Sequence, residues 1–227
     1  MSAAHEPTED CQDALETLGR VYWYPLYAFA RRVGQAPEDA ADLTQKFFAR
    51  LLDKDFLQSV DREKGRFRTF LLVVFKRFLS NEHQRQKTMR RGGHLNRLPI
   101  DVEIGERRYG YEPTDHWTAE ALFERRWALT LLEQVVQQLQ ADYEHKGNLP
   151  LFECCKPFLT GNSGGSPYAD VARQLGMTES AVRVAVHRMR DRYRELLKHE
   201  VAQTLGDASA IDDELQRLKA AVIGPIT

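Results

Sequence analysis

Three polar residues near the end of the chain have the types and the spacing needed to read DNA bases. Ser180, Arg183 and His187 follow one another at steps of three and four residues, which places them on one face of a helix. An arginine bonds guanine through two parallel hydrogen bonds, and a serine or histidine contacts a base or a phosphate. The pattern therefore predicts a recognition helix whose N-terminal turns face the major groove of DNA.

Local signals predict two helices and a turn that position these three residues. Ser166 and Thr178 are residue types favoured as N-caps, and Pro167 suits the first turn of a helix. Gly176 supplies a tight turn between the helices, and the small Ala172 allows them to cross closely. A helix–glycine–helix pattern also occurs in purely structural hairpins. The caps and the arginine-rich second helix favour a DNA-binding helix-turn-helix instead.

A second basic segment, Arg62–Arg97, lies in the first half of the chain. It carries eleven lysines and arginines against two glutamates. Its aromatic residues Phe67 and Phe70 are candidates for stacking on unpaired bases, although Phe70 also suits a core position. The whole chain has a formal net charge of −1, so acidic surface elsewhere balances this segment and the basic Arg183–Lys198.

Helical periodicity covers most of the chain and predicts an all-α fold of two small domains. Apolar residues recur at helical spacing over 15–33, 37–51, 67–91, 118–145, 150–159, 167–175 and 178–193. Pro25 predicts either a kinked first helix or two helices. Residues 92–117 lose the periodicity and collect glycine, proline and charges, which is typical of a linker. Residues 209–222 predict a terminal helix that either packs on one module or binds a regulator.

Composition argues against several classes of protein. No segment approaches the ~20 apolar residues of a membrane span, and we expect no signal peptide because the first residues lack an apolar run. Three cysteines give no disulfide framework, which fits a reducing cytoplasm. Metal-ligand spacings, a glycine-rich phosphate loop and a nucleophile elbow are absent. We therefore predict no metal, no cofactor and no enzymatic activity.

Two motifs resemble conserved regions of bacterial sigma factors. The runs 167–172 (PYADVA), 175–176 (LG) and 180–183 (SAVR) resemble region 4. The run 39–45 (DAADLTQ), followed by Phe48, Arg50 and Leu51, resembles region 2. The order of the motifs, with a linker between them, is similar to the extracytoplasmic-function group of the sigma-70 family.

This resemblance implies a division of labour along the chain. Residues 1–91 would be region 2, which binds core polymerase and recognises and melts the minus-ten element, and residues 92–117 would be the linker. Residues 118–206 would be the region 4 helix-turn-helix for the minus-thirty-five element, followed by a C-terminal extension at 207–227. The implied partners are promoter DNA, the β′ clamp helices and β flap of core RNA polymerase, and as a further candidate an anti-sigma factor or other regulator.

The resemblance also implies three sets of site residues. The set for core polymerase is Asp39, Asp42, Gln45, Phe48, Arg50 and Leu51. The set for minus-ten DNA is Lys64, Arg66, Phe67, Arg68, Lys76, Arg77, Asn81 and Arg85. The set for minus-thirty-five DNA is Thr178, Ser180, Arg183, His187, Arg188 and Arg190.

The polymerase-docking segment departs from the family pattern. Ala41 and Lys46 stand where the family has acidic residues, which predicts a less negative docking face. Thr44 lies between the key polar residues, and a phosphate there would add a charge of roughly −1.5 to −2. Phosphorylation of Thr44 is therefore a hypothesis for how the negative charge is restored.

The sequence thus predicts a sigma factor that binds core RNA polymerase and directs promoter-specific initiation. The alternative is an operator-binding regulator with a similar helix-turn-helix that acts without core polymerase. That alternative accounts for the C-terminal helices but not for the segment 39–51 or the basic aromatic segment upstream of them.

Overall fold

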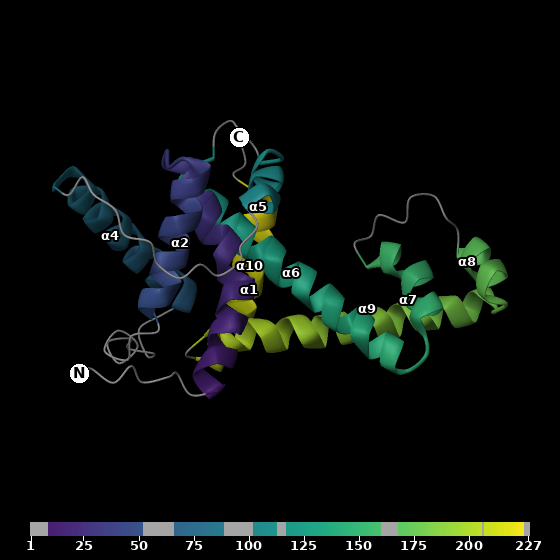
Figure 1. The fold of residues 1–227 in the computed structure, drawn as a ribbon. Helices are drawn as coiled ribbons and strands as arrows, with labels where there is room; N and C mark the ends of the chain where they lie inside the picture. The colour runs from purple at the N-terminus through teal and green to yellow at the C-terminus, as the bar shows by residue number, and fades with distance from the viewer. Residues whose placement is uncertain are drawn as a thin grey trace. The chain divides into compact units, whose positions relative to one another are not determined.

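A computed structural model describes residues 9–51, 66–88, 102–112, 117–159, 168–205 and 207–224 of the chain. These residues are almost entirely helical, which confirms the predicted all-α fold (Figure 1). They form two compact units, unit 1 being Met1–Thr130 with Thr204–Thr227 and unit 2 being Leu131–Gln203. No helix within the described ranges is both long enough and apolar enough to cross a membrane.

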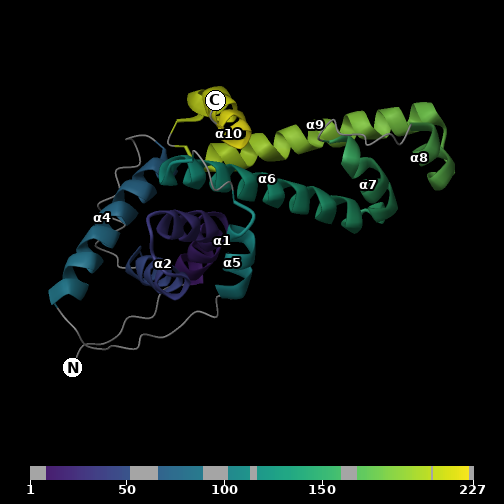
Figure 2. The ribbon, with the colours of Figure 1, turned by 90° about the horizontal axis from the view of Figure 1, so that it is seen from above.

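Unit 1 is built around a pair of helices near the N-terminus. Its helices are α1 (Glu9–Arg32), α2 (Pro37–Leu51), α4 (Phe67–Thr88), α5 (Val102–Tyr109), the first part of α6 (Ala119–His145), η2 (Ala208–Ala210) and α10 (Ile211–Ile223). Helix α1 continues through Pro25, so the first of the predicted alternatives, a single helix, is the one observed. Helices α4 and α5 lie on opposite sides of the α1–α2 pair (Figures 1 and 2).

Aromatic side chains form the contact between α1, α2 and α4. The ring of Phe47 lies 4.9 Å from that of Phe75, and the ring of Phe29 lies 6.1 Å from Phe75, in both cases edge to face. Phe78 is also buried and stacks on Phe75. Burial of such side chains contributes about 1.5–3 kcal/mol each, so this cluster holds α4 on the α2 surface.

Helix α5 lies inside residues 92–117, which the sequence predicted as a linker. Glu106 of α5 accepts hydrogen bonds from Tyr27 Oη at 2.6 Å and from Arg31 Nε at 2.6 Å. Arg31 lowers the pKa of Glu106 through this bond. Just after α5, Glu112 accepts a hydrogen bond from Tyr24 Oη at 2.7 Å. Helices this short are marginal alone, so contacts with α1, which periodicity cannot reveal, account for the missed helix.

Unit 2 contains the remainder of α6, α7 (Leu149–Cys155), η1 (Lys156–Phe158), α8 (Tyr168–Leu175) and α9 (Glu179–Gln203). Gly147, with φ +67°, ends α6, and Gly176, with φ +65°, turns the chain from α8 into α9 as predicted. Its core is the buried set Leu139, Phe152, Cys155, Phe158, Val171, Ala172, Val182, Val186 and Met189. Cys155 is a packing residue because it is fully buried in this core, and the burial raises the pKa of its thiol to about 11.

Candidate nucleic-acid and protein interfaces

Helix α2 divides the predicted polymerase-binding residues between two faces. Asp39, Asp42 and Arg50 are exposed, and Gln45 is partly exposed. Phe48 and Leu51 are buried, at 6% and 3% exposure. The prediction that these last two contact a partner is therefore wrong for this conformation, because both belong to the core that fixes α2.

Thr44 also lies on the buried face of α2. Its side chain is fully buried, and its hydroxyl donates a hydrogen bond to the Ala40 carbonyl at 2.7 Å. A kinase cannot reach this hydroxyl in the folded protein, so the structure contradicts phosphorylation of Thr44 in this conformation. Ala41 is buried as well, so its replacement of an acid does not alter the exposed face of α2.

Two arginines predicted to bind minus-ten DNA, Arg66 and Arg68, point into unit 1. Both form ion pairs with Glu214 of α10, Arg66 Nε at 2.5 Å from Oε2, and Glu214 is fully buried. Arg68 Nε also donates to Glu124 at 2.5 Å, and its guanidinium lies 4.2 Å from the Trp127 ring centroid. Burial lowers the pKa of Arg68, and the Glu124 carboxylate opposes that shift. A DNA role for Arg68 is wrong for this conformation, since it is 3% exposed and paired twice.

The C-terminal residues belong to unit 1 and are part of its packing. Arg66 and Leu205 form an isolated β-bridge, and Phe67 N donates to the Thr204 carbonyl at 3.4 Å. Of the two predicted roles for the terminal helix, packing on a module is the one observed. Sequence reasoning missed Glu214, although its position gave a signal. Glu214 lies four residues before the buried Leu218, so this acid lies on the buried face of the helix.

The remainder of α4 presents its polar residues outward. Arg77, Asn81 and Arg85 are exposed, and the DNA contacts predicted for them stay a prediction. Lys76 is ion-paired with Glu120 of α6 at 2.5 Å. Lys64 lies outside the described residues, and Phe67 packs edge-on against Tyr22 at 5.6 Å between ring centroids.

A hollow of about 360 Å³ lies between the end of α2 and the outer part of α4. Its lining residues are Arg50, Asn81, Gln84 and Arg85. The structure thus brings together Arg50, predicted for the polymerase, with two residues predicted for DNA. The two guanidinium and two amide groups can hydrogen-bond phosphate and base edges.

The first turns of α9 expose the residues predicted to read bases. Thr178 caps the helix, its Oγ1 accepting a hydrogen bond from Ala181 N at 3.2 Å, as predicted. Ser180, His187 and Arg188 are exposed, and the Arg183 side chain is 59% exposed. These side chains meet the geometric requirement for groove contact because they share the solvent face of one helix.

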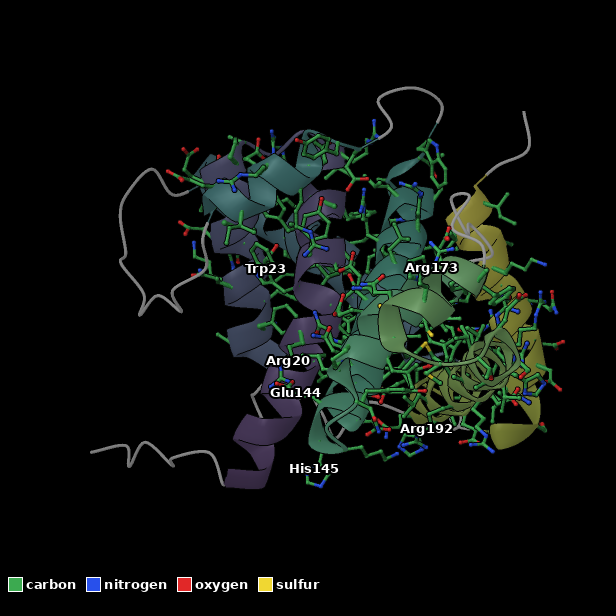
Figure 3. The ribbon with its side chains drawn as sticks, turned by 90° about the vertical axis from the view of Figure 1, so that its right-hand side faces the viewer. Arg20, Trp23, Glu144, His145, Arg173 and Arg192 are labelled. Carbon is green, nitrogen blue, oxygen red and sulfur yellow. The ribbon has the colours of Figure 1, made fainter. Side chains whose placement is uncertain are left out.

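Further along α9, the arginines have partners within unit 2. Arg190 donates two hydrogen bonds to the Phe158 carbonyl, from Nε at 3.1 Å and Nη2 at 2.7 Å. Arg192, labelled in Figure 3, donates to Asp142 of α6 at 2.9 Å. The guanidinium of Arg190 thus caps the end of η1, and the DNA contact predicted for this partly exposed residue stays a prediction.

Residues 22–88 match the family model of sigma-70 region 2. The match runs from the middle of α1 through α4 and includes the exposed face of α2. Proteins with this region are non-enzymatic transcription initiation factors. The match covers less than half of the chain and supports a sigma-70 family sigma factor with a role in transcription initiation. The chain matches no curated protein and no solved structure.

Proposed function

We propose that this sigma factor belongs to the extracytoplasmic-function group, binds core RNA polymerase in the cytoplasm of a bacterium and directs promoter-specific initiation. The observation that carries the proposal is the region 2 match, and the exposed side chains on α9 of unit 2, which are predicted to read bases, support it. In this reading the α8–α9 pair is a DNA-binding helix-turn-helix.

The exposed face of α2 is the proposed contact with the β′ clamp helices. Asp39 and Asp42 lie three residues apart on this face, with Gln45 partly exposed after them. The buried Phe48 and Leu51 anchor α2 from the other side. A contact surface on a firmly packed helix needs little ordering when a partner binds, which favours affinity.

The outer part of α4 is the proposed site for minus-ten DNA. Arg77 and Arg85 supply charge for phosphates, and Asn81 supplies an amide for a base edge. Arg50 joins this set because it lines the same hollow as Asn81 and Arg85. Arg66 and Arg68 are left out because Glu214 and Glu124 pair with them.

The N-terminal turns of α9 are the proposed reader of the minus-thirty-five element. Ser180, Arg183 and His187 would contact bases, and Arg188 a phosphate. Unit 2 would also contact the β flap, and an anti-sigma factor or other regulator remains a candidate partner. Because one polymerase would hold both units on the same promoter, each unit can bind weakly and still act at high effective concentration.

DNA footprinting with and without core polymerase separates this proposal from an operator-binding regulator. We expect sequence-specific protection only when purified chain and bacterial core polymerase are both present. Asp42→Ala should weaken core binding without changing the protected sequence, whereas Asp213→Ala, at an exposed acid of α10 outside the proposed contacts, should leave core binding unchanged. Specific protection by the chain alone, at the same sites and unaffected by core, would instead identify the regulator.

A further inference from the structure

The guanidinium of Arg183 is held on its edge and on its face. Its Nε and Nη2 atoms donate to Glu179 Oε1 at 3.2 and 2.6 Å. Its Cζ lies 4.4 Å from the ring centroid of Tyr168, which belongs to α8. The Arg183 side chain nevertheless remains 59% exposed to solvent. An exposed arginine is usually free to adopt many rotamers, but these two contacts restrict this one.

Tyr168 is itself fixed by the interior of unit 2. Its ring stacks on Phe158, with 4.6 Å between centroids and 13° between planes. Phe158 is 3% exposed, and its carbonyl accepts the two hydrogen bonds from Arg190. The contacts therefore run from Arg190 through Phe158 and Tyr168 to Arg183, leaving α9 and returning to it two turns earlier.

Glu179 bonds one edge of the Arg183 guanidinium, and this leaves the other edge free to face outward. A guanidinium pairs with guanine through two parallel N–H donors in one plane. Glu179 takes the Nε–Nη2 edge of Arg183, which leaves Nη1 and the second hydrogen of Nη2 for an acceptor pair. The ring of Tyr168 fixes the plane in which that pair must lie.

We propose that Tyr168 is a positioning residue for base recognition. Together with Glu179 it orients Arg183 to bond the O6 and N7 acceptors of a guanine in the major groove. Tyr168 touches Arg183 and acts through it, so its effect is confined to the base that Arg183 reads. The proposal rests on the proposed function, in which α9 reads duplex DNA.

Selection from randomised DNA by the chain bound to core polymerase tests this role. The probe is a duplex pool with a randomised window of about one helical turn, and the readout is the base preference at each position. We expect the parent to prefer guanine at one position and Arg183→Ala to lose that preference. Tyr168→Leu, which keeps apolar volume without the ring, should reduce it about two- to fivefold at that position only. Tyr168→Phe, which keeps the ring, should match the parent.

A second variant and a double variant keep the test decisive if Tyr168→Leu lowers stability. Glu179→Gln changes an exposed side chain and should also reduce the guanine preference, by about two- to threefold. In Arg183→Ala, adding Tyr168→Leu should cause no further loss at that position.

Three results overturn the inference. One is an unchanged guanine preference in both Tyr168→Leu and Glu179→Gln, and another is a loss in Tyr168→Leu spread evenly over all positions. The third is an additive loss in the double variant. If the parent chain with core polymerase enriches no sequence at all, the proposed function itself is contradicted. That result differs from the three above, in which the parent still selects guanine.

Discussion

Arg66 and Arg68 lie at the start of α4 in unit 1, Arg183 lies near the start of α9 in unit 2, and the surroundings of the two sites are opposite. Arg68 is 3% exposed and contacts Glu124, Glu214 and Trp127. Arg183 is 59% exposed and is held by neighbours that leave one edge of its guanidinium open. A basic segment in the sequence therefore corresponds to a buried ion-pair cluster in one unit and to a solvent-facing surface in the other.

The difference follows from where the partner carboxylates lie in the chain. Glu179 is four residues from Arg183, so their pairing is local to one helical turn. Glu214 is far from Arg66 and Arg68 in sequence and reaches them only because α10 packs into unit 1. Buried charges need such pairing, because an isolated charge in the interior is strongly unfavourable.

The largest expected effect is the loss of stability in Glu214→Ala. Removing this carboxylate leaves Arg68 buried with one partner fewer, which should cost about 3–5 kcal/mol of unfolding free energy. Urea unfolding measures this change in unfolding free energy. Asp213→Ala, at an exposed neighbour in the same helix, is the control and should change stability by less than about 0.5 kcal/mol. Equal effects in the two variants would contradict the inward role of Glu214.

Arg190→Ala and Arg188→Ala sharpen the comparison within α9. Arg190→Ala should lower the unfolding free energy by about 1.5–3 kcal/mol, because it removes the charged hydrogen bonds to the Phe158 carbonyl. Arg188→Ala, at an exposed residue, should leave the unfolding free energy unchanged and reduce the slope of the salt dependence of DNA binding by about 1. Thermal unfolding and DNA titrations at several salt concentrations measure the two effects. A loss of stability in Arg188→Ala and none in Arg190→Ala would contradict the structural role of Arg190 and the phosphate-binding role of Arg188.

A smaller effect concerns Glu106 and pH. Arg31 holds the pKa of Glu106 below its ordinary value, so this carboxylate contributes stability above its unfolded pKa. That contribution is lost as the pH falls through the lower pKa of the folded state. The parent should therefore lose more unfolding free energy than Glu106→Gln between about pH 6 and pH 3. Identical pH profiles for the two proteins would show that Glu106 does not contribute to the pH dependence of stability.

Much of the fold and part of the candidate site follow from local sequence signals. Pro37, Thr178 and Gly176 mark helix boundaries because proline, caps and positive-φ glycine act within one turn. The inward position of Thr44 was also readable, since it lies four residues from the buried Ala40 and Phe48. The same spacing places Phe48 on the buried face of α2, whereas the resemblance implies that it contacts polymerase.

Other features depend on residues distant in the chain and could not be predicted. Helix α5 is stabilised by contacts of Glu106 with Tyr27 and Arg31 of α1. The inward turn of Arg68 requires Glu124 and Glu214, which come from two other helices. No period or spacing in one sequence brings such partners together, because tertiary packing selects them.

Mapping transcript start sites is the most direct test of the central claim, that both units act together in promoter-specific initiation. Core polymerase would be supplied with promoter-length genomic fragments, with the parent chain or with Asp42→Ala or Arg183→Ala. We predict defined starts with the parent, none with core alone, weaker transcription with Asp42→Ala and reduced discrimination among promoters with Arg183→Ala. The same starts with and without the chain would contradict the account.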